Sequence, residues 1–306
     1  MEYIQAMYST TTLNATFRMC APLLLGLAGY CFVNKAGIMN IALESFMLIS
    51  SFVALLGSYL FHNAWIGLLF GVLAGLALAA LYGAFTFHAG ANGLITGVGF
   101  NLSGWGLTTM LLVAIFHTRG ATNVDAVSFS PINIPFLRDI PYIGTIFNNQ
   151  TILVYMAPLL MVIAWVVMYK TPFGLRVQTV GLNPNAAETA GVSVLQHSWI
   201  AMLLSGACMG LAGTFISLNS LAMFSENMSG GRGFMVMASA MVARGNPLKA
   251  MLYGILFGYC EALTLTWSGL DIYGQITDML PYLAVLLVLF LSNIKNIKTF
   301  GRDDVS

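Results

Sequence analysis

Two acidic residues, Glu44 and Glu261, fall inside apolar stretches of a chain of 306 residues, of which only 8% are charged. A carboxylate in such a setting can bind a proton or sodium ion, form an ion pair, or line a polar pathway. Glu44 follows Lys35 by about ten residues, so an ion pair with Lys35 or capping of a helix start explains it without a transport role. Glu261 lies some twelve residues past Lys249, which is about 18 Å along a helix. We expect Glu261 to face a pathway or to be protonated.

A second group of side chains suits an uncharged solute that forms hydrogen bonds. Asn101, Ser103, Trp105 and Thr108 lie close together in one apolar stretch, and a pathway for such a solute needs polar but mostly neutral walls. Hydrogen bonding between helices, which Ser, Thr and Asn provide in membranes, is the competing interpretation. The spacing does not place all four on one helix face. We keep Asn101 and Trp105 as pathway or gating candidates, together with Glu44 and Glu261.

No signature of catalysis accompanies these residues. The sequence contains no Gly-x-x-x-x-Gly-Lys-Ser/Thr phosphate loop, no His-Glu-x-x-His zinc helix and no Gly-x-Ser-x-Gly nucleophile turn. The four cysteines lack Cys-x-x-Cys spacing and the four histidines lie far apart, which predicts neither disulfides nor a metal site. We therefore expect no catalytic residue, metal or cofactor in this chain, and an energy source in a partner protein or an ion gradient.

The composition indicates that helices in a lipid bilayer position these groups. Hydrophobic residues make up 58% of the chain, and the mean hydropathy is +0.83. Between Glu44 and Arg119, 74 consecutive residues carry no charge, whereas about a quarter of the residues in soluble domains are charged. The net charge is +1, so no overall field attracts nucleic acid, and DNA and RNA binding are excluded.

Apolar runs between turn signals predict nine membrane spans, with eight or ten as alternatives. They lie near residues 13–33, 38–60, 64–87, 94–116, 151–169, 199–223, 233–244, 248–268 and 279–293. The seventh is too short to cross about 30 Å of hydrocarbon, so a half-helix or a re-entrant piece is expected there. Lipid requires every backbone group to be satisfied internally. The predicted fold class is therefore an all-α polytopic membrane protein, with residues 1–306 in a single bundle.

The distribution of basic residues predicts the orientation. Eight of them are assigned to the cytoplasm: Lys35, Lys170, Arg176, Arg244, Lys249, Lys295, Lys298 and Arg302. Only Arg18, Arg119, Arg138 and Arg232 are left outside, which predicts an external N-terminus and a cytoplasmic C-terminus. Two segments then lie outside the membrane. The external one, 117–150, contains three prolines among scattered apolar residues and is expected to form an ordered lid, either as a partner-docking surface or as a plain cap.

The second segment, 170–198, is predicted to be cytoplasmic. It contains start and stop signals for two short helices. In the second helix Asn183 can cap the first free amides, Pro184 occupies the first helical position, and Gly191 ends the helix in a left-handed turn. Between them Ala186, Ala187 and Ala190 favour helix. A helix of about two turns is not stable alone in water, so it leans either on its own bundle or on another protein.

Glycines four residues apart recur along the spans and predict close packing of helices. They are Gly67, Gly71 and Gly75, then Gly206 and Gly210 followed by Gly213, and then Gly254 and Gly258.

These motifs resemble a known family. Asn183-Pro-Asn-Ala-Ala-Glu-Thr-Ala-Gly191, followed by Ser205-Gly-Ala-Cys-Met-Gly-Leu-Ala-Gly213, is similar to the membrane permeases of bacterial ABC importers for nucleosides, ribose and related sugars, and branched-chain amino acids. Similar stretches at 34–44, 91–101, 231–234, 246–247 and 257–258 extend the resemblance over roughly residues 20–290. The runs 140–147 and 279–282 are most like the smaller permease of nucleoside importers. Departures occur at Leu182, where the family usually has Glu, at Ser45, where it has Gly, and at 243–245, where Gly-Arg-Trp is common.

The resemblance implies a transmembrane permease subunit that forms the pathway for a nucleoside. It implies that residues 170–198 are a coupling segment seated in a groove of a separate ATPase subunit, with these residues involved: Asn183, Pro184, Ala186, Ala187, Glu188 and Gly191. ATP and Mg²⁺ are then expected on the ATPase subunits.

The other implied partners are a second permease, either a different paralogue or a second copy, and an extracellular or periplasmic solute-binding protein. The implied location is the bacterial inner membrane. A ribose- or galactose-type sugar is the alternative solute. An ion-coupled secondary transporter is the alternative mechanism, and it would use mid-membrane ionisable groups such as Glu44 and Glu261.

Overall fold

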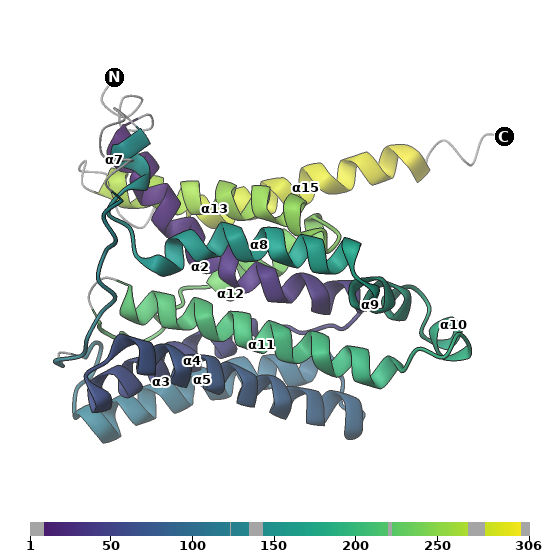
Figure 1. Ribbon diagram of the computed structural model, residues 1–306, viewed down its shortest axis with the longest axis horizontal. Helices are drawn as coiled ribbons and strands as arrows, with labels where there is room; N and C mark the ends of the chain where they lie inside the picture. The colour runs from purple at the N-terminus through teal and green to yellow at the C-terminus, as the bar shows by residue number, and fades with distance from the viewer. Residues whose placement is uncertain (1–8, 123, 135–142, 220–221, 269–278, 301–306) are drawn as a thin grey trace.

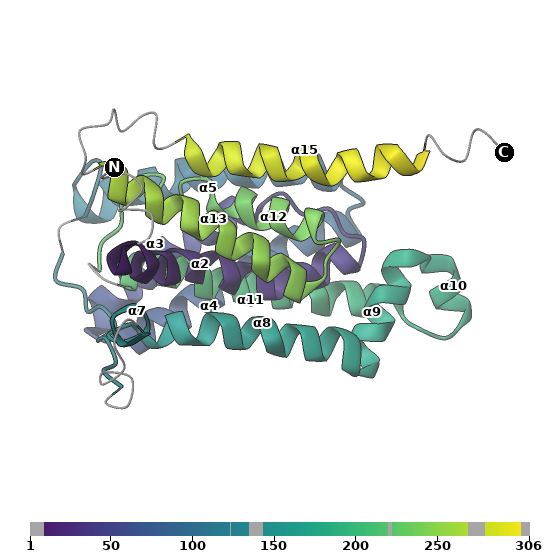
Figure 2. The ribbon, with the colours of Figure 1, turned by 90° about the horizontal axis from the view of Figure 1, so that it is seen from above.

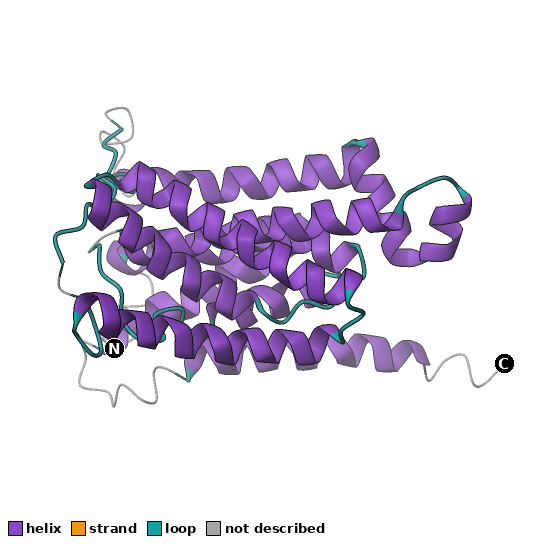
Figure 3. Cartoon of the chain, turned by 90° about the horizontal axis from the view of Figure 1, so that it is seen from below, coloured by secondary structure: helices purple, strands orange, loops and turns teal. Residues whose placement is uncertain are grey.

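The computed structural model describes residues 9–122, 124–134, 143–219, 222–268 and 279–300. Within these ranges the regular structure is helical (Figures 1 and 3), and extended pairing is limited to two isolated bridges, Ala121 with Ser225 and Ile132 with Gln150. The helices are α2 (Thr10–Lys35), α3 (Leu43–Phe61), α4 (Ala64–Gly83) continued by a π-helical turn (Ala84–His88), α5 (Gly93–Phe116), α7 (Ile143–Phe147), α8 (Ile152–Lys170), α9 (Pro172–Leu182), α10 (Pro184–Thr189), α11 (Val194–Leu218), α12 (Arg232–Val242), α13 (Pro247–Ser268) and α15 (Leu280–Phe300).

Seven of these helices are long and apolar enough to cross a membrane, and two shorter apolar helices accompany them, Arg232–Val242 and Leu280–Phe290. Each of the nine predicted spans coincides with one of these helices, so the predicted all-α polytopic bundle is confirmed. The predicted short span is α12, whose 11 residues reach only about 16 Å at 1.5 Å per residue. It therefore begins or ends inside the bundle.

Helix α11 is displaced as a whole by five residues from its predicted position. The predicted span is 199–223, whereas the helix is Val194–Leu218. Ser193 caps it by accepting a hydrogen bond from the backbone N–H of Gln196 at 3.4 Å, so the polar residues read as part of a loop form its first turn. The segment between α8 and α11 is correspondingly shorter than predicted.

The most buried helix, α2, lies at the centre of the bundle (Figure 2). From Cys20 to Val33 every residue of this helix is buried, which is the pattern of a helix that is covered on all sides. It packs against α8, α11, α12 and α13. A second group, α3 and α4, packs against α11, and α5 covers α3. The views in Figures 1 and 2 together place α5 and α15 at the two edges of the same side of the bundle.

Close contacts between α4 and α11 explain the predicted glycine packing. A Cβ atom on Gly210 would lie 2.7 Å from the carbonyl oxygen of Gly71, and a Cβ on Gly206 would overlap Gly75. In lipid the hydrophobic effect does not hold helices together, so van der Waals contact at such close crossings does. The sequence pattern therefore marks a true helix interface.

Substitution of Gly210 by alanine is expected to destabilise the protein by about 1–3 kcal/mol, because the added methyl group overpacks the crossing. Gly99 in α5 is the matched control, since a Cβ there meets no atom within 4 Å. Gly99→Ala should raise stability by up to about 1 kcal/mol through helix propensity. Chemical denaturation of the purified protein measures both. Equal shifts for the two variants would show that the crossing tolerates a side chain.

The two ends of the bundle differ in structure. At one end α10 reaches furthest, next to α9 and beyond the end of α15, and at the other lie the start of α2 and α7 (Figures 1 and 2). We call the first the hairpin end and the second the opposite end. Basic residues gather at the hairpin end, where α2 and α8 finish and α13 begins, and they include Lys35, Lys170, Arg176, Arg244 and Lys249. Of the four basic residues predicted to lie outside, Arg18 is within α2 and Arg232 is the first residue of α12, and Arg138 lies outside the described residues.

The described part of the predicted external loop, 117–150, is fastened across the opposite end. Ser58 of α3 both donates to the carbonyl oxygen of Val127 at 2.7 Å and accepts from its N–H at 3.0 Å. The N–H of Phe129 donates to the carbonyl oxygen of Leu218 at 3.0 Å. This part is therefore ordered, as expected of a lid. Four of the residues that suggested a lid, Pro135, Phe136, Leu137 and Pro141, lie outside the described residues.

Candidate functional site

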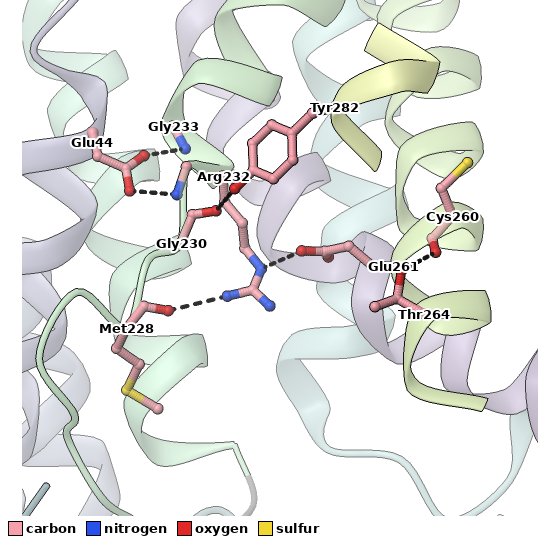
Figure 4. Close-up of polar contacts among 10 residues, drawn as sticks. Glu44, Met228, Gly230, Arg232, Gly233, Cys260, Glu261, Thr264 and Tyr282 are labelled. Carbon is pink, nitrogen blue, oxygen red and sulfur yellow. Dashed lines mark hydrogen bonds and ion pairs between the residues drawn. The ribbon is translucent and has the colours of Figure 1, made fainter. Parts of the chain in front are cut away.

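Glu44 caps a helix that begins inside the bundle. The two oxygens of this buried carboxylate accept hydrogen bonds from the N–H groups of Gly231 and Gly233, each at 2.8 Å (Figure 4). These amides belong to the start of α12, where backbone N–H groups have no partner within the helix. The carboxylate also compensates the positive end of the helix dipole. Of the two structural roles considered for Glu44, capping is therefore the one that matches, although the capped helix is α12.

Glycine is required on both sides of this contact. Gly231 has a φ of +81°, in the left-handed region that side chains disfavour. A Cβ on Gly233 would lie 2.5 Å from the backbone nitrogen of Glu44. The segment 231–234 carried part of the family resemblance. Its glycines are needed because α12 approaches the start of α3 closely.

Arg232 and Glu261 form an ion pair between α12 and α13. Arg232 Nε lies 3.0 Å from Glu261 Oε1, with the side chains only 21% and 13% exposed. Arg232 Nη1 also donates to the carbonyl oxygen of Met228 at 3.2 Å (Figure 4). Glu261 Oε2 is buried and has no hydrogen-bond partner in the described part of the chain. The prediction for Glu261 was a pathway-facing or a protonated side chain, whereas the structure places the charged partner Arg232 beside it.

The turn that leads into α12 receives contacts from three other helices. We define the α12 turn as residues 228–233. Glu44 reaches it from α3, Glu261 from α13, and Tyr282 from α15, whose hydroxyl donates to the carbonyl oxygen of Gly230 at 2.6 Å (Figure 4). The position of the α12 turn is therefore fixed by side chains from three other helices.

Asn101 and Trp105, which were predicted together, have different surroundings. Asn101 Oδ1 accepts from the N–H of Ser45 at 3.0 Å, and its Nδ2 donates to the carbonyl oxygen of Ile41 at 2.9 Å. Its side chain thus joins α5 to the start of α3, which agrees with the interpretation of hydrogen bonding between helices. Thr108 donates within its own helix, to the carbonyl oxygen of Gly104 at 2.9 Å.

Trp105 lies one helical turn beyond Asn101 on α5, is 55% exposed and lines a cavity of about 590 Å³. The other lining residues are Gly106, Thr109, Met110, Val113, Arg119 and Glu226. Thr109 was not among the predicted pathway residues, although it follows Trp105 by one helical turn. Glu226 had no signal in the sequence, because it comes from a segment more than a hundred residues away.

The predicted pair of short helices is present as α9 and α10 at the hairpin end. Asn183 Oδ1 accepts from the N–H of Ala186 at 3.1 Å, Pro184 is the first residue of α10, and Gly191 has a φ of +79°. The two helices enclose a cavity of about 330 Å³. Among the six coupling candidates Ala187 is buried, whereas Asn183, Pro184, Ala186, Glu188 and Gly191 are exposed. The most exposed large apolar side chain is Leu182, at 86%.

The hairpin of α9 and α10 is attached to the central helix by a contact between backbones. A Cβ on Gly181 would overlap the carbonyl oxygen of Lys35 at the end of α2. Gly37, with a φ of +72°, turns the chain at the same place, and its own Cβ would lie 3.3 Å from the carbonyl oxygen of Gly181. The base of the hairpin thus rests on α2 with no side chain in between.

Together these features define a class of protein. A bundle of apolar helices, with a helix that starts inside it and a capped helical hairpin at one end, is the architecture of a multi-pass membrane transport subunit. Residues 11–290 match the family described as branched-chain amino acid transport system / permease component. The chain belongs to this family.

Two relatives are similar along most of their length. The nucleoside ABC transporter permease protein NupC of Lactococcus lactis is 32% identical over 281 residues, which is 88% of each chain. The guanosine ABC transporter permease protein NupQ of Bacillus subtilis is 30% identical over 289 residues, covering 90% of this chain and 89% of the relative. A further Lactococcus lactis nucleoside permease, NupB, is 23% identical over 85% of this chain and 74% of its own.

The fold also resembles a solved structure, an inward-facing conformation of a metal-chelate-type ABC transporter. The TM-score is 0.50 with 15% sequence identity, over 92% of this chain and 85% of the other. The likeness concerns the fold of a membrane subunit. With the family membership and the apolar helices, it supports a multi-pass protein of the cell membrane that acts as a transport component.

Proposed function

We propose that this chain is one of two permease subunits of an ATP-binding-cassette importer for nucleosides in the bacterial inner membrane. The observation that carries the proposal is the hairpin of α9 and α10, which projects from the bundle with Leu182 86% exposed. A helix of six residues gains too little from its own hydrogen bonds to be stable alone. A groove on a separate ATPase subunit is the partner that covers it.

Nucleosides are the preferred solute because two relatives that are alike over most of their length are named as permeases for nucleosides and for guanosine. A distinct paralogue is preferred as second permease, because Lactococcus lactis has two nucleoside permeases, of which NupC is the more similar to this chain and NupB the less. We infer that the chain pairs with a protein of the NupB type. A solute-binding protein completes the importer at the opposite end.

In the proposed orientation the hairpin end is cytoplasmic. The basic residues at the ends of α2 and α8 and at the start of α13 support it, since such residues favour the cytoplasmic side. The ATPase subunits carry ATP and Mg²⁺, and this chain contributes no catalytic group. ATP binds one conformation of the complex better than the other, and this difference in binding free energy drives the change from outward to inward access.

Within the chain, a displacement of α10 by the ATPase passes to the end of α2 through the backbone contact at Gly181. Helix α2 packs directly on α12 and α13, which hold the Arg232–Glu261 pair. The α12 turn is thus linked to the hairpin through a single central helix. This connection allows ATP binding on a partner to change the position of polar groups at mid-depth.

The proposal is tested by uptake of labelled uridine, adenosine and ribose in cells that carry the intact chain, a deletion, or Leu182→Arg. We expect both changes to lower nucleoside uptake at least about tenfold, which corresponds to about 1.4 kcal/mol, and to leave ribose uptake unchanged. The variant should remain in the membrane and lose copurification of the ATPase. Leu182→Met is the control and should transport normally. Ala187 is unsuitable as a test position because it is buried, so a large side chain there would unfold the hairpin.

Other results would redirect the proposal. If deletion lowers only ribose uptake, the solute is a sugar. If Leu182→Arg transports normally, the hairpin is not the coupling site, and an ion-coupled carrier becomes the better explanation.

A further inference from the structure

We propose that the cavity at Trp105 is a binding subsite for a nucleoside in transit, in which Trp105 stacks on the base and Glu226 accepts hydrogen bonds from the sugar hydroxyls. The inference rests on the proposed function and adds the residues that recognise the solute. The cavity lies between one face of α5 and the segment that leads to the α12 turn. Its volume of about 590 Å³ is within the range of roughly 300–1,000 Å³ found for small-molecule sites.

Neither anchoring in lipid nor packing in the protein core explains Trp105. It is about 18 Å from the start of α5, close to the middle of a membrane, whereas tryptophans that anchor a protein in lipid gather at the two interfaces. Its side chain is 55% exposed, so it does not fill the core either. A Cβ on the adjacent Gly106 would meet no atom within 4 Å. A half-exposed aromatic face at mid-depth, beside a residue with no side chain, is suited to stacking with a flat solute.

The polar part of the cavity is held in place by backbone pairing. The N–H of Glu226 donates to the carbonyl oxygen of Gly120 at 2.8 Å, and the N–H of Gly120 donates to Glu226 Oε1 at 3.1 Å. The bridge between Ala121 and Ser225 continues this pairing. One carboxylate oxygen of Glu226 is therefore fixed by the protein, and the other is available to a ligand. A carboxylate accepts two hydroxyl hydrogens readily, and a ribose offers them on neighbouring carbons.

Arg119 and Thr109 line the same cavity with unused hydrogen-bonding capacity. Arg119 forms no ion pair with Glu226, and it makes no hydrogen bond with any residue that the structure describes. The hydroxyl of Thr109, one turn beyond Trp105, likewise has no partner within the described ranges. Both donors can reach ring nitrogens or carbonyl groups of a base. Met110 and Val113 supply the apolar remainder of the wall.

This combination selects a chemical class. A free sugar would use the carboxylate and leave the aromatic face bare, and an aliphatic amino acid has no ring to stack. A nucleoside has one flat aromatic part and one polyol part, and it carries no charge that would need a counter-ion at mid-depth. The lining of the cavity contains a complement for each part.

The test is equilibrium binding of labelled adenosine and labelled ribose to the purified complete complex, both permeases with the ATPase subunits, without the solute-binding protein. Stacking on an aromatic residue contributes enough that its loss weakens binding by about 5- to 150-fold. We therefore expect Trp105→Ala to weaken adenosine binding at least fivefold and to leave ribose binding unchanged. Trp105→Phe should retain adenosine binding within about threefold, because a ring remains for stacking.

Two further variants make the result specific. Trp65 has nearly the same exposure, 56%, and lies on α4 at a different cavity, so Trp65→Ala should bind adenosine like the unaltered complex. Glu226→Gln should weaken the binding of adenosine and of ribose alike, since both present the hydroxyls. A variant that merely disturbs folding would weaken the binding of adenosine and of ribose to the same degree.

The inference is overturned if Trp105→Ala binds adenosine normally, or if it loses adenosine and ribose to the same degree. It is also overturned if Trp65→Ala has the same effect as Trp105→Ala. A failure of the proposed function is distinct from these results, because the unaltered complex would then neither bind nor transport any nucleoside.

Discussion

Replacement of Arg232 by methionine is expected to lower the free energy of unfolding by about 3–5 kcal/mol, because it leaves the buried carboxylate of Glu261 without its ion partner. Glu261 already has one oxygen without a hydrogen bond in the described part of the chain, so no second group takes over. Chemical denaturation of the purified complex measures the loss. Because the pair joins α12 to α13, transport should fall together with stability.

The double variant Arg232→Met with Glu261→Met is the control for this prediction. It removes both charges, and replacing a buried ion pair by apolar side chains of similar size is often neutral or stabilising. Most of the lost stability should therefore return, whereas transport should not return if the pair also positions the α12 turn. If Arg232→Met alone unfolds at the same denaturant concentration as the unaltered protein, the Glu261 carboxylate is not charged or not paired in the membrane.

Glu44→Ala is the second substitution with a large expected effect. It removes the acceptor of two hydrogen bonds, from the N–H groups of Gly231 and Gly233, and hydrogen bonds to a charged group contribute about 1.5–3 kcal/mol each. A loss of about 3–6 kcal/mol in the free energy of unfolding is expected, and transport should be lost because the start of α12 is no longer fixed to α3.

The stability of Glu44→Gln should lie between that of the unaltered protein and that of Glu44→Ala. The glutamine amide has one oxygen that can accept a hydrogen bond and an NH₂ group that cannot. The matched control is Asp125→Ala, which removes an exposed carboxylate and should change stability by less than about 0.5 kcal/mol. Melting of the detergent-solubilised complex, followed by circular dichroism, ranks the four proteins. Equal melting of Glu44→Ala and Asp125→Ala would show that solvent, and not Glu44, satisfies the α12 amides.

The sequence was informative wherever a structural feature depends on residues near one another in the chain. The apolar runs located every span, and the shortness of the run at 233–244 indicated a partial helix. Asn183, Pro184 and Gly191 predicted α10 correctly because capping is a local interaction. Leu182, noted only as a departure from a family pattern, is the side chain that the hairpin exposes most.

Contacts between distant segments were beyond such reasoning. The partner of Glu261 is the first residue of another helix, and the partners of Glu44 are amides more than 180 residues away. Spacing indicated that both carboxylates needed an explanation, but it contained no information about which helix would supply it. Asn101 and Trp105 were treated alike because they are neighbours in sequence, yet a helix turns about 40° beyond a full turn in four residues. In this case the 40° offset separates a side chain that is hydrogen-bonded to the start of α3 from one that lines an open cavity.

The contact between Gly181 and the end of α2 determines how much of a displacement at the hairpin reaches the rest of the molecule. Side chains between two helices act as a compliant layer, because they can change rotamer and absorb a shift of about an ångström. Here the two backbones touch directly, and no such layer is present. The contact between the hairpin and α2 is therefore stiff. A displacement of the hairpin is passed to the most enclosed helix of the bundle and not to one at its periphery. In the proposed importer, even a small displacement of the hairpin by the ATPase would therefore move α2.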